Sequence, residues 1–315
     1  VQLTALRSKC HHETESTGRM SAEDDPFSCF DDDADSAGDA TSTDEQGEQS
    51  ALLEDVQRDP NNGILAFHPG TEQALLNHVQ QNLDKMRDRN DWDAAASVIG
   101  YIDDFCVRRH WMMHVGQEKG SIIKDFLREC VDSKAGQNLC VVEIGTYCGY
   151  SSVLLASELK RLGCVFQIWS IEVVESHAKV ARRIIALAGL TDNIQVLSMD
   201  PYNETVGGLL KRNVKSDVID FLFIDHDKSL YLADLQNLES SGLIKKGSFV
   251  AADNVIFAKI DDYRQYVSKL MEAGTVQTRL AMSWLEYSEP DRNTDEARMN
   301  LMKDGIELTV YLRDP

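Results

Sequence analysis

Short apolar runs alternate with amphipathic helical segments along most of this chain, and this alternation constrains the fold more than any other feature. The run Leu139–Val142 is continuously apolar and ends at a glycine turn, which is typical of a strand buried on both faces of a parallel sheet. Further strands are expected at 165–171, 194–197, 218–224 and 248–252, with helices between them. Strands and helices that alternate in this way indicate an α/β fold with a parallel sheet.

The two ends of this region follow different patterns. Before the first strand, apolar residues recur at three- and four-residue steps, which predicts amphipathic helices. These helices are expected around Leu76–Met86, Ala95–Cys106 and Ile122–Cys130. After the last strand of the alternating region, 276–282 and 306–312 look like strands, and only an irregular acidic stretch separates them. We therefore expect an antiparallel pair at one edge of the sheet.

Negative charge is concentrated at the N-terminal end. Residues 1–70 hold 16 acidic and 4 basic side chains, a net charge of −12 out of −20 for the whole chain. Residues 11–55 are rich in Asp, Glu, Ser, Thr and Gly, so they cannot bury enough apolar surface to offset the entropy lost on ordering. We expect an acidic disordered tail over residues 1–70 and one folded domain over residues 71–315.

Composition also excludes several classes of function. An acidic chain is poorly suited to bind nucleic acid, whose affinity for proteins comes largely from Lys and Arg. No apolar run approaches the roughly 18 residues that a membrane-spanning helix needs. The seven cysteines are scattered without a C-x-x-C pair, which favours reduced thiols and a cytoplasmic location. The chain starts at Val1, so a removed targeting segment stays open.

The first motif with chemical potential is the turn that follows the first buried strand. Gly145 and Gly149 stand there in G-x-x-x-G spacing, and glycine lets the backbone approach a ligand closely at the start of a helix. This spacing differs from G-x-G-x-x-G, which disfavours a nicotinamide oxidoreductase. Glu172 ends the next strand, where a carboxylate can accept hydrogen bonds from both ribose hydroxyls. The alternatives are a structural turn and a solvated carboxylate.

Two later strands end in oxygen-bearing side chains. The strand at 218–224 is followed by Asp225, and the strand at 248–252 is followed by Asp253 and Asn254. Because the carboxyl ends of parallel strands share one edge of a sheet, these oxygens should lie close together. A set without thiolates or an obligatory histidine favours Mg²⁺. Capping of the following helices is the alternative for either motif alone.

Lys228 lies one helical turn beyond Asp225, so both side chains can point into the same crevice. A neighbouring divalent cation would disfavour the protonated amine, which suits a general base. A surface lysine with its head group in water is the alternative.

Six separated segments together resemble the catechol O-methyltransferases in order and spacing. They are His110–Gly116, Glu143–Ser151, Ser170–Glu172, Asp225–Lys228, Ala252–Ile256 and Trp284–Tyr287. The resemblance extends over Thr71–Pro315 and does not cover the tail. It implies a Rossmann-like seven-stranded methyltransferase sheet, mostly parallel with an antiparallel edge, with helices on both faces and extra N-terminal helices.

The resemblance also implies a reaction and a set of residues. The implied enzyme moves a methyl group from S-adenosylmethionine to one hydroxyl of a catechol, or a related vicinal-diol phenol, that is chelated by Mg²⁺. Lys228 would be the catalytic base, and the metal would be held by Asp225, Asp253 and Asn254. The donor would be contacted by Val115, Glu143, Gly145, Tyr147, Ser151, Glu172, Asp200 and Asp225. The acceptor would be contacted by Lys228, Asn254, Glu286 and Trp111. We expect a monomer.

The chain departs from that family pattern around the acceptor. Asp227 stands in place of a tryptophan, Ala258 in place of a proline and His114 in place of an asparagine, while Asp200 replaces a serine near the adenine. The loss of apolar walls leaves the preferred ring open. Two other functions therefore remain: a metal-dependent methyltransferase for larger phenolic conjugates, and a non-catalytic module that binds the donor.

Overall fold

The computed structural model describes residues 70–86, 92–110, 112–134, 136–285 and 302–315. The tail predicted over residues 1–70 therefore lies outside the described residues except for Gly70. Two predicted acceptor-binding residues, Trp111 and Glu286, also lie outside them.

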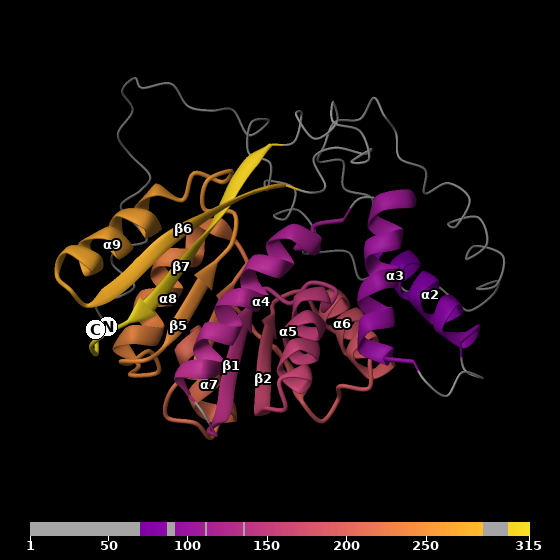
Figure 1. Cartoon of the computed structure of the whole chain (residues 1–315), viewed down its shortest axis with the longest axis horizontal. Coiled ribbons are helices and arrows are strands. Elements are labelled where there is room, and N and C mark those ends of the chain that lie inside the picture. Colours follow the sequence, from indigo (N-terminus) through magenta and orange to yellow (C-terminus); the bar gives the residue numbers. More distant parts are fainter. Residues whose placement is uncertain (1–69, 87–91, 111, 135, 286–301) are drawn as a thin grey trace. The chain divides into compact units, whose positions relative to one another are not determined.

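Among the described residues, seven strands form one sheet in the order β3-β2-β1-β4-β5-β7-β6 (Figure 1). Their bounds are β1 (Asn138–Ile144), β2 (Val165–Glu172), β3 (Ile194–Ser198), β4 (Phe221–Ile224), β5 (Phe249–Ala252), β6 (Val276–Trp284) and β7 (Lys303–Tyr311). Strands β1 to β5 pair in parallel, whereas β7 runs antiparallel to both β5 and β6. The predicted parallel sheet with an antiparallel edge is confirmed, and the last strand of the chain lies between β5 and β6.

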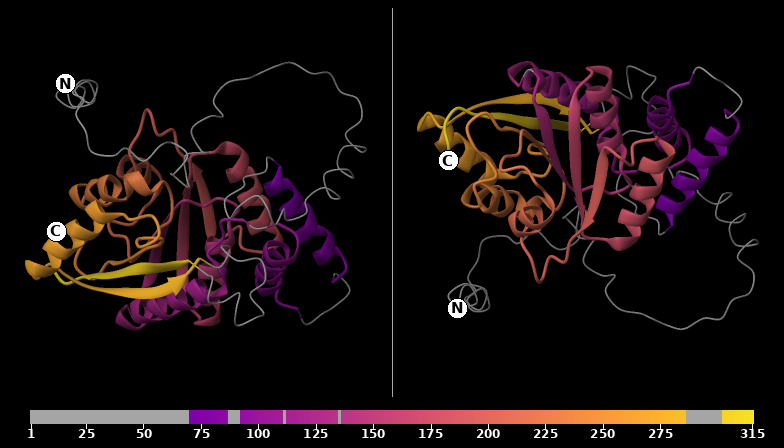
Figure 2. Two further views of the ribbon diagram at one scale, coloured as in Figure 1. Left: turned by 90° about the horizontal axis from the view of Figure 1, so that it is seen from above. Right: turned by 90° about the horizontal axis from the view of Figure 1, so that it is seen from below.

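Helices cover both faces of the sheet, as predicted (Figure 2). Their bounds are α2 (Thr71–Asp84), α3 (Ala94–Arg108), α4 (Gly116–Ser133), α5 (Tyr150–Arg161), α6 (Glu175–Leu187), α7 (Val206–Asn213), α8 (Tyr231–Ser240) and α9 (Asp261–Glu272). Helices α2 to α6 contribute to one apolar cluster, and α7 to α9 contribute to the other. Helices α2 and α3 contact each other and pack on α6 and α5, respectively, at one side of the sheet (Figure 1).

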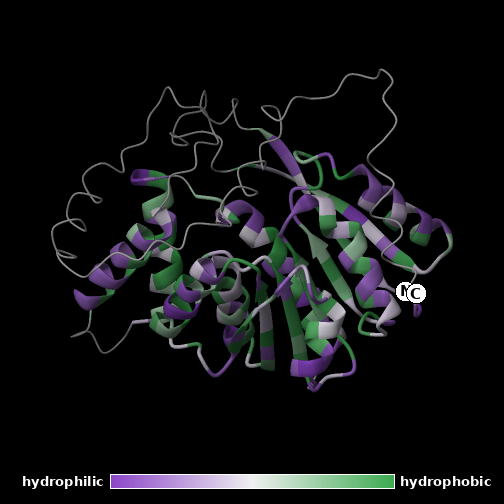
Figure 3. Cartoon of the chain, turned by 180° about the vertical axis from the view of Figure 1, so that it is seen from behind, coloured by the Kyte–Doolittle hydropathy of each residue, from purple (hydrophilic) through white to green (hydrophobic). Residues whose placement is uncertain are grey.

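The central strands are apolar because both of their faces are covered. In β1, Val141 belongs to the cluster under α4 and α5, while Val142 belongs to the cluster under α7 and α8. This follows from the alternation of side chains along a strand. Every residue of β4 and β5 is buried. Figure 3 shows hydrophobic residues along the central strands, and hydrophilic residues interspersed with hydrophobic ones along the helices.

Two strands begin three residues away from their predicted first residues. Strand β4 begins at Phe221 instead of Val218, because the Ser216 hydroxyl donates to the Val218 carbonyl oxygen at 2.7 Å and forms a local turn. Strand β7 begins at Lys303, so Asp304 lies in the sheet and not in the acidic stretch where the sequence placed it. None of the helices in the described part of the chain combines the length and apolar character needed to cross a bilayer.

Candidate active site

The candidate site lies at the edge of the sheet where four parallel strands end. Ile144 of β1 pairs with Ile171 of β2 and with Ile224 of β4, and Ile224 pairs in turn with Ala252 of β5. The four strands therefore end level with one another. The residues that follow these positions are Gly145, Glu172, Asp225 and Asp253, which the structure brings to one edge as the sequence predicts.

The turn after β1 lies in close contact with the residue that follows β4. Gly145 has a φ of +99°, and a Cβ atom built there would lie 2.3 Å from the carbonyl oxygen of Asp225. Only glycine tolerates both the backbone angle and the approach. Tyr147, two residues later, holds a φ of 46°, which is rare for a residue with a side chain. The turn thus keeps a strained shape between the end of β1 and the start of α5.

Glu172 is held rigidly beside this turn. Its Oε2 accepts from the Tyr147 backbone N–H at 2.7 Å, and its Oε1 accepts from the Val174 N–H at 2.9 Å. Burial raises the pKa of Glu172, although these two hydrogen bonds and the charge of His177 oppose the shift. The carboxylate is therefore preorganised to face a ligand in the turn.

Glu143 is a fully buried carboxyl group under the same turn. Its Oε2 accepts hydrogen bonds from the Ser152 and Ser170 hydroxyls. Burial raises the pKa of Glu143 to about 7. Hydrogen bonds from Ser151, Ser152 and Ser170 act in the opposite direction and lower this pKa. A buried carboxyl with this pKa gains its full charge most readily when a cation lies beside it. Ser151, in the first turn of α5, is buried next to it.

Two further residues assigned to the donor lie in different surroundings. Val115 is buried at the start of α4. Asp200 is exposed after β3, where its carboxylate accepts from the Tyr202 N–H at 3.0 Å and from the Asn203 side-chain amide at 2.6 Å. These two bonds, led by that from Asn203, lower the pKa of Asp200. Its carboxylate is thus engaged by its own turn.

The predicted metal ligands form part of a buried network of charges. Asp225 Oδ1 lies 2.7 Å from Lys228 Nζ, and Asp253 Oδ1 lies 2.8 Å from Lys119 Nζ. Burial raises the pKa of Asp253 to about 6; Lys119 opposes this shift, and the negative charge of Asp225 adds to it. Asn254 follows with a φ of 58°, and its backbone N–H donates to Asp253 Oδ1 at 2.7 Å.

This set fits a hard divalent cation. Among the described residues, no three His, Cys, Asp or Glu side chains converge as ligands for a metal ion, so the candidate set rests on two carboxylates and one amide. The Asn254 amide nitrogen donates to Asp304 at 2.7 Å, which leaves the amide oxygen free to face another ligand. Two carboxylates and an amide oxygen match the preference of Mg²⁺, which retains several waters.

Lys228 stands beside the predicted metal ligands in a short 3₁₀ helix, η3 (Lys228–Leu230). Its Nζ donates to Asp225 Oδ1 at 2.7 Å and to the Tyr231 hydroxyl at 2.9 Å. Asp227 is exposed, and its carboxylate caps η3 by accepting from the Ser229 N–H at 2.9 Å. The amine thus points toward Asp225, as the sequence predicts, and Asp227 has a local structural partner.

His114, which stands next to Val115 in place of the asparagine of the resembled pattern, is buried. Its Nε2 lies 3.4 Å from Asp103 Oδ1. Burial lowers its pKa, but interactions with Cys106 and Asp103 outweigh burial and raise the pKa to about 10. The substitution therefore places a histidine against Asp103 in the segment that leads into α4.

Four residues near the site were not predicted from the sequence. Glu72 accepts from the Tyr147 hydroxyl at 2.9 Å, and His177 lies between Glu72 and Glu172, 3.8 and 4.0 Å from their carboxylates. The other two are Lys119 and Asp304. A signal for Lys119 does exist in the sequence, because it precedes Ile123, Phe126, Leu127 and Cys130 on the apolar face of α4.

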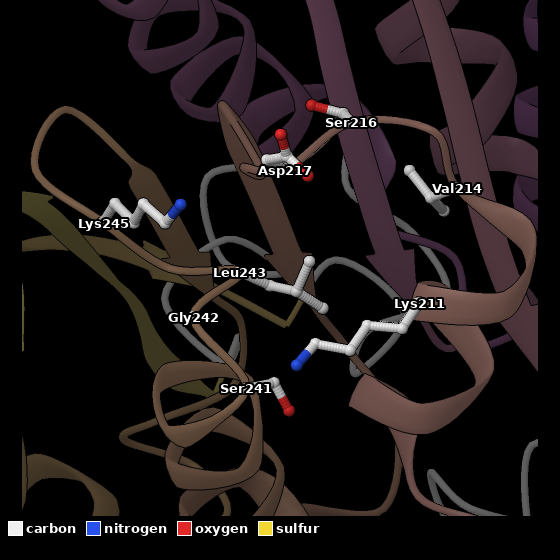
Figure 4. Close-up of a pocket in the computed structure, with 8 residues that line it drawn as sticks. All are labelled: Lys211, Val214, Ser216, Asp217, Ser241, Gly242, Leu243 and Lys245. Atoms are coloured by element: carbon white, nitrogen blue, oxygen red, sulfur yellow. The ribbon is translucent and has the colours of Figure 1, made fainter.

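A separate hollow of about 380 Å³ opens at the other end of the strands. It is lined by Lys211, Val214, Ser216, Asp217, Ser241, Gly242, Leu243 and Lys245 (Figure 4). These residues come mostly from the loops that lead into β4 and β5, whereas the candidate site lies where those strands end. The hollow contains none of the predicted site residues.

Comparisons with known proteins concern the family and the fold. The model of a family described as O-methyltransferase matches residues 100–282. Catechol O-methyltransferase B of Danio rerio is 34% identical over 216 residues, which cover 69% of this chain and 72% of the relative. Catechol O-methyltransferase of Bos taurus is 32% identical over 244 residues, or 76% of each chain.

Solved structures share the fold. An O-methyltransferase from Bacillus cereus in complex with SAH superposes with a TM-score of 0.51 at 18% identity and covers 75% of this chain and 99% of that one. At this level of identity the likeness supports the fold alone.

Proposed function

This chain belongs to the O-methyltransferase family, and from that premise we propose that it transfers a methyl group from S-adenosylmethionine to one hydroxyl of a catechol chelated by Mg²⁺. One observation carries the proposal. Glu143 and Glu172, a buried carboxyl pair suited to the donor, lie near the carboxyl ends of β1 and β2. An oxygen ligand set suited to a divalent cation begins at Asp225, directly after the adjacent strand β4.

At the donor end, the chain's own groups would bind and orient. Glu172 would accept hydrogen bonds from the ribose hydroxyls, because its position is already set by two backbone N–H groups. The Glu143 carboxyl would face the positive charge of the methionine part, and Asp200 would lie toward the adenine. The remaining contacts would come from Val115, Gly145, Tyr147, Ser151 and Asp225. S-adenosylmethionine supplies a methyl group already activated on a sulfonium.

At the acceptor end, Asp225, Asp253 and Asn254 would hold Mg²⁺. The cation would lower the pKa of the catechol hydroxyls, which otherwise titrate near pH 10, and fix both oxygens. Lys228 would accept the proton of the attacking hydroxyl, with its amine aimed by Asp225 and Tyr231. Asn254 and Glu286 would contact the two hydroxyls, and Trp111 would line the ring.

The test is an incubation with labelled S-adenosylmethionine, Mg²⁺ and a panel of vicinal diols, with product masses as the readout. We expect monomethylated catechols, and we expect their formation to stop when EDTA removes the cation. Transfer that persists in EDTA would contradict the metal site. Absence of transfer to every diol would contradict the function.

A second acceptor class is favoured by one observation. Asp227 is exposed at the position where the related pattern has a tryptophan, so the acceptor side lacks an apolar wall. Larger phenylpropanoid conjugates need such space. Methylation of conjugates with little turnover of simple catechols would favour this alternative.

A further inference from the structure

We propose that Asp304, held in place by Lys119, is the positioning residue that turns the Asn254 amide so that its oxygen faces the cation. This inference deepens the proposed function and rests on it. Asp304 lies at the start of β7 and is fully buried, and its Oδ2 lies 2.7 Å from Asn254 Nδ2.

The chemistry of the partners determines the orientation of the amide. A side-chain amide has a donating end and an accepting end of similar shape, so its surroundings decide which end points where. Asp304 Oδ2 also lies 2.5 Å from the ammonium of Lys119, and an aspartate in such an ion pair only accepts hydrogen bonds. The Asn254 nitrogen must therefore face Asp304, and its oxygen must face away.

Asp304 is itself fixed from three sides. Its Oδ1 accepts from the Phe257 backbone N–H at 3.0 Å, while Oδ2 receives both Lys119 and Asn254. The segment after β5 is tied to the same strand, because the Val255 N–H donates to the Gly305 carbonyl oxygen at 3.1 Å. The carboxylate can thus transmit a defined position to the asparagine.

Lys119 connects Asp304 with Asp253, another of the proposed metal ligands. Its side chain is only 3% exposed, and its Nζ lies 2.8 Å from Asp253 Oδ1 as well as 2.5 Å from Asp304 Oδ2. A lysine is a donor only, so it engages Asp253 Oδ1 and leaves Oδ2 as the oxygen for a cation. One buried ammonium therefore orients both Asp253 and, through Asp304, Asn254. Partners behind metal ligands typically change metal affinity 10–100-fold when removed.

The experiment measures Mg²⁺ affinity by calorimetry, with S-adenosylmethionine present, in Asp304→Ala and Lys119→Met. The matched control is Glu307→Gln, which alters another buried carboxylate of β7 that pairs with Arg264 at 3.2 Å. Donor affinity without metal is measured in every variant, because a general loss of structure would weaken it too. Asp304→Leu, which has a branched side chain of similar shape but no acceptor, replaces Asp304→Ala if that variant does not fold.

We expect Mg²⁺ affinity to fall by roughly 10-fold or more in the Asp304 and Lys119 variants, with donor affinity and the control unchanged. Affinity equal to that of the unaltered protein in the folded Asp304 variant would overturn the inference. An equal fall in donor affinity, or an equal effect in Glu307→Gln, would also overturn it. Failure of the unaltered protein to bind Mg²⁺ would instead refute the proposed metal site.

Discussion

Single residues at the candidate site are held by partners before any ligand binds. Glu172 has two backbone donors, Lys228 has Asp225 and Tyr231, and Asn254 has Asp304. Groups fixed in this way need little reorganisation during a reaction, which is a main source of catalytic power in enclosed sites. The cost is a concentration of buried charge that makes each side chain sensitive to substitution.

Lys228→Ala should lower kcat by about 10²–10⁴-fold, the usual contribution of a general base. The affinity for S-adenosylmethionine should stay the same, because Lys228 is not among the residues assigned to the donor and, apart from Asp225, those residues lie on other segments. Steady-state kinetics and a donor titration check both parts. Lys245→Ala, at the hollow beyond the other ends of the strands, is the control and should leave kcat unchanged. Unchanged turnover in Lys228→Ala would remove its role as base.

Glu143 should make stability depend on pH. Burial raises its pKa to about 7, whereas 4.5 is its ordinary value in the unfolded chain. The folded state therefore binds more protons between these pH values, and the stability contributed by this carboxyl is complete below pH 4.5 and lost as pH rises through 7. The loss amounts to about 3 kcal/mol.

Glu143→Gln should remove that dependence, because glutamine does not titrate. Denaturant unfolding from pH 4 to 8 should show the free energy of unfolding of Glu143→Gln rising relative to the unaltered protein by roughly 3 kcal/mol. A difference in the free energy of unfolding between the two proteins that is the same at every pH would contradict this account of Glu143.

At the scale of elements, the site depends on how closely the turn after β1 approaches the end of β4. Gly145→Ala should destabilise the protein by about 3 kcal/mol or more, because its Cβ would overlap the Asp225 carbonyl oxygen and its φ is unfavourable. Donor affinity should fall with it. Thermal unfolding and donor titration measure the two effects.

Gly163→Ala separates the two causes of this destabilisation, the overlap of the Cβ atom and the unfavourable φ. Gly163 has a φ of +71°, yet no atom lies within 4 Å of a Cβ built there. Gly163→Ala should therefore lower the free energy of unfolding by only about 1 kcal/mol, which is the cost of the unfavourable backbone angle alone. Equal losses in both variants would mean that the approach to Asp225 is unimportant.

At the scale of the whole molecule, the sheet, both apolar clusters and every described site residue lie within residues 70–315. We propose that residues 71–315 form the catalytic domain. A chain that begins at Gly70 should retain the unfolding temperature, kcat and KM of the full chain. Loss of activity with unchanged unfolding temperature would assign a role in the reaction to residues 1–69.

Much of this arrangement was predictable from the sequence because it follows from local periodicity. The apolar run around Val141 predicts a central strand. Parallel pairing alone then places the carboxyl ends of the strands, and with them Glu172, Asp225 and Asp253, at one edge of the sheet. The reaction assigned to these residues stays a proposal.

The supports behind these residues were decided only by the tertiary structure. Lys119 and Asp304 are 185 residues apart, and they meet because β7 lies between β5 and β6 while α4 packs against that end of the sheet. The contact of Glu72 with Tyr147 likewise depends on where α2 docks. Sequence periodicity reports which face of an element is buried, but partners across elements depend on packing between distant segments, which no local pattern encodes.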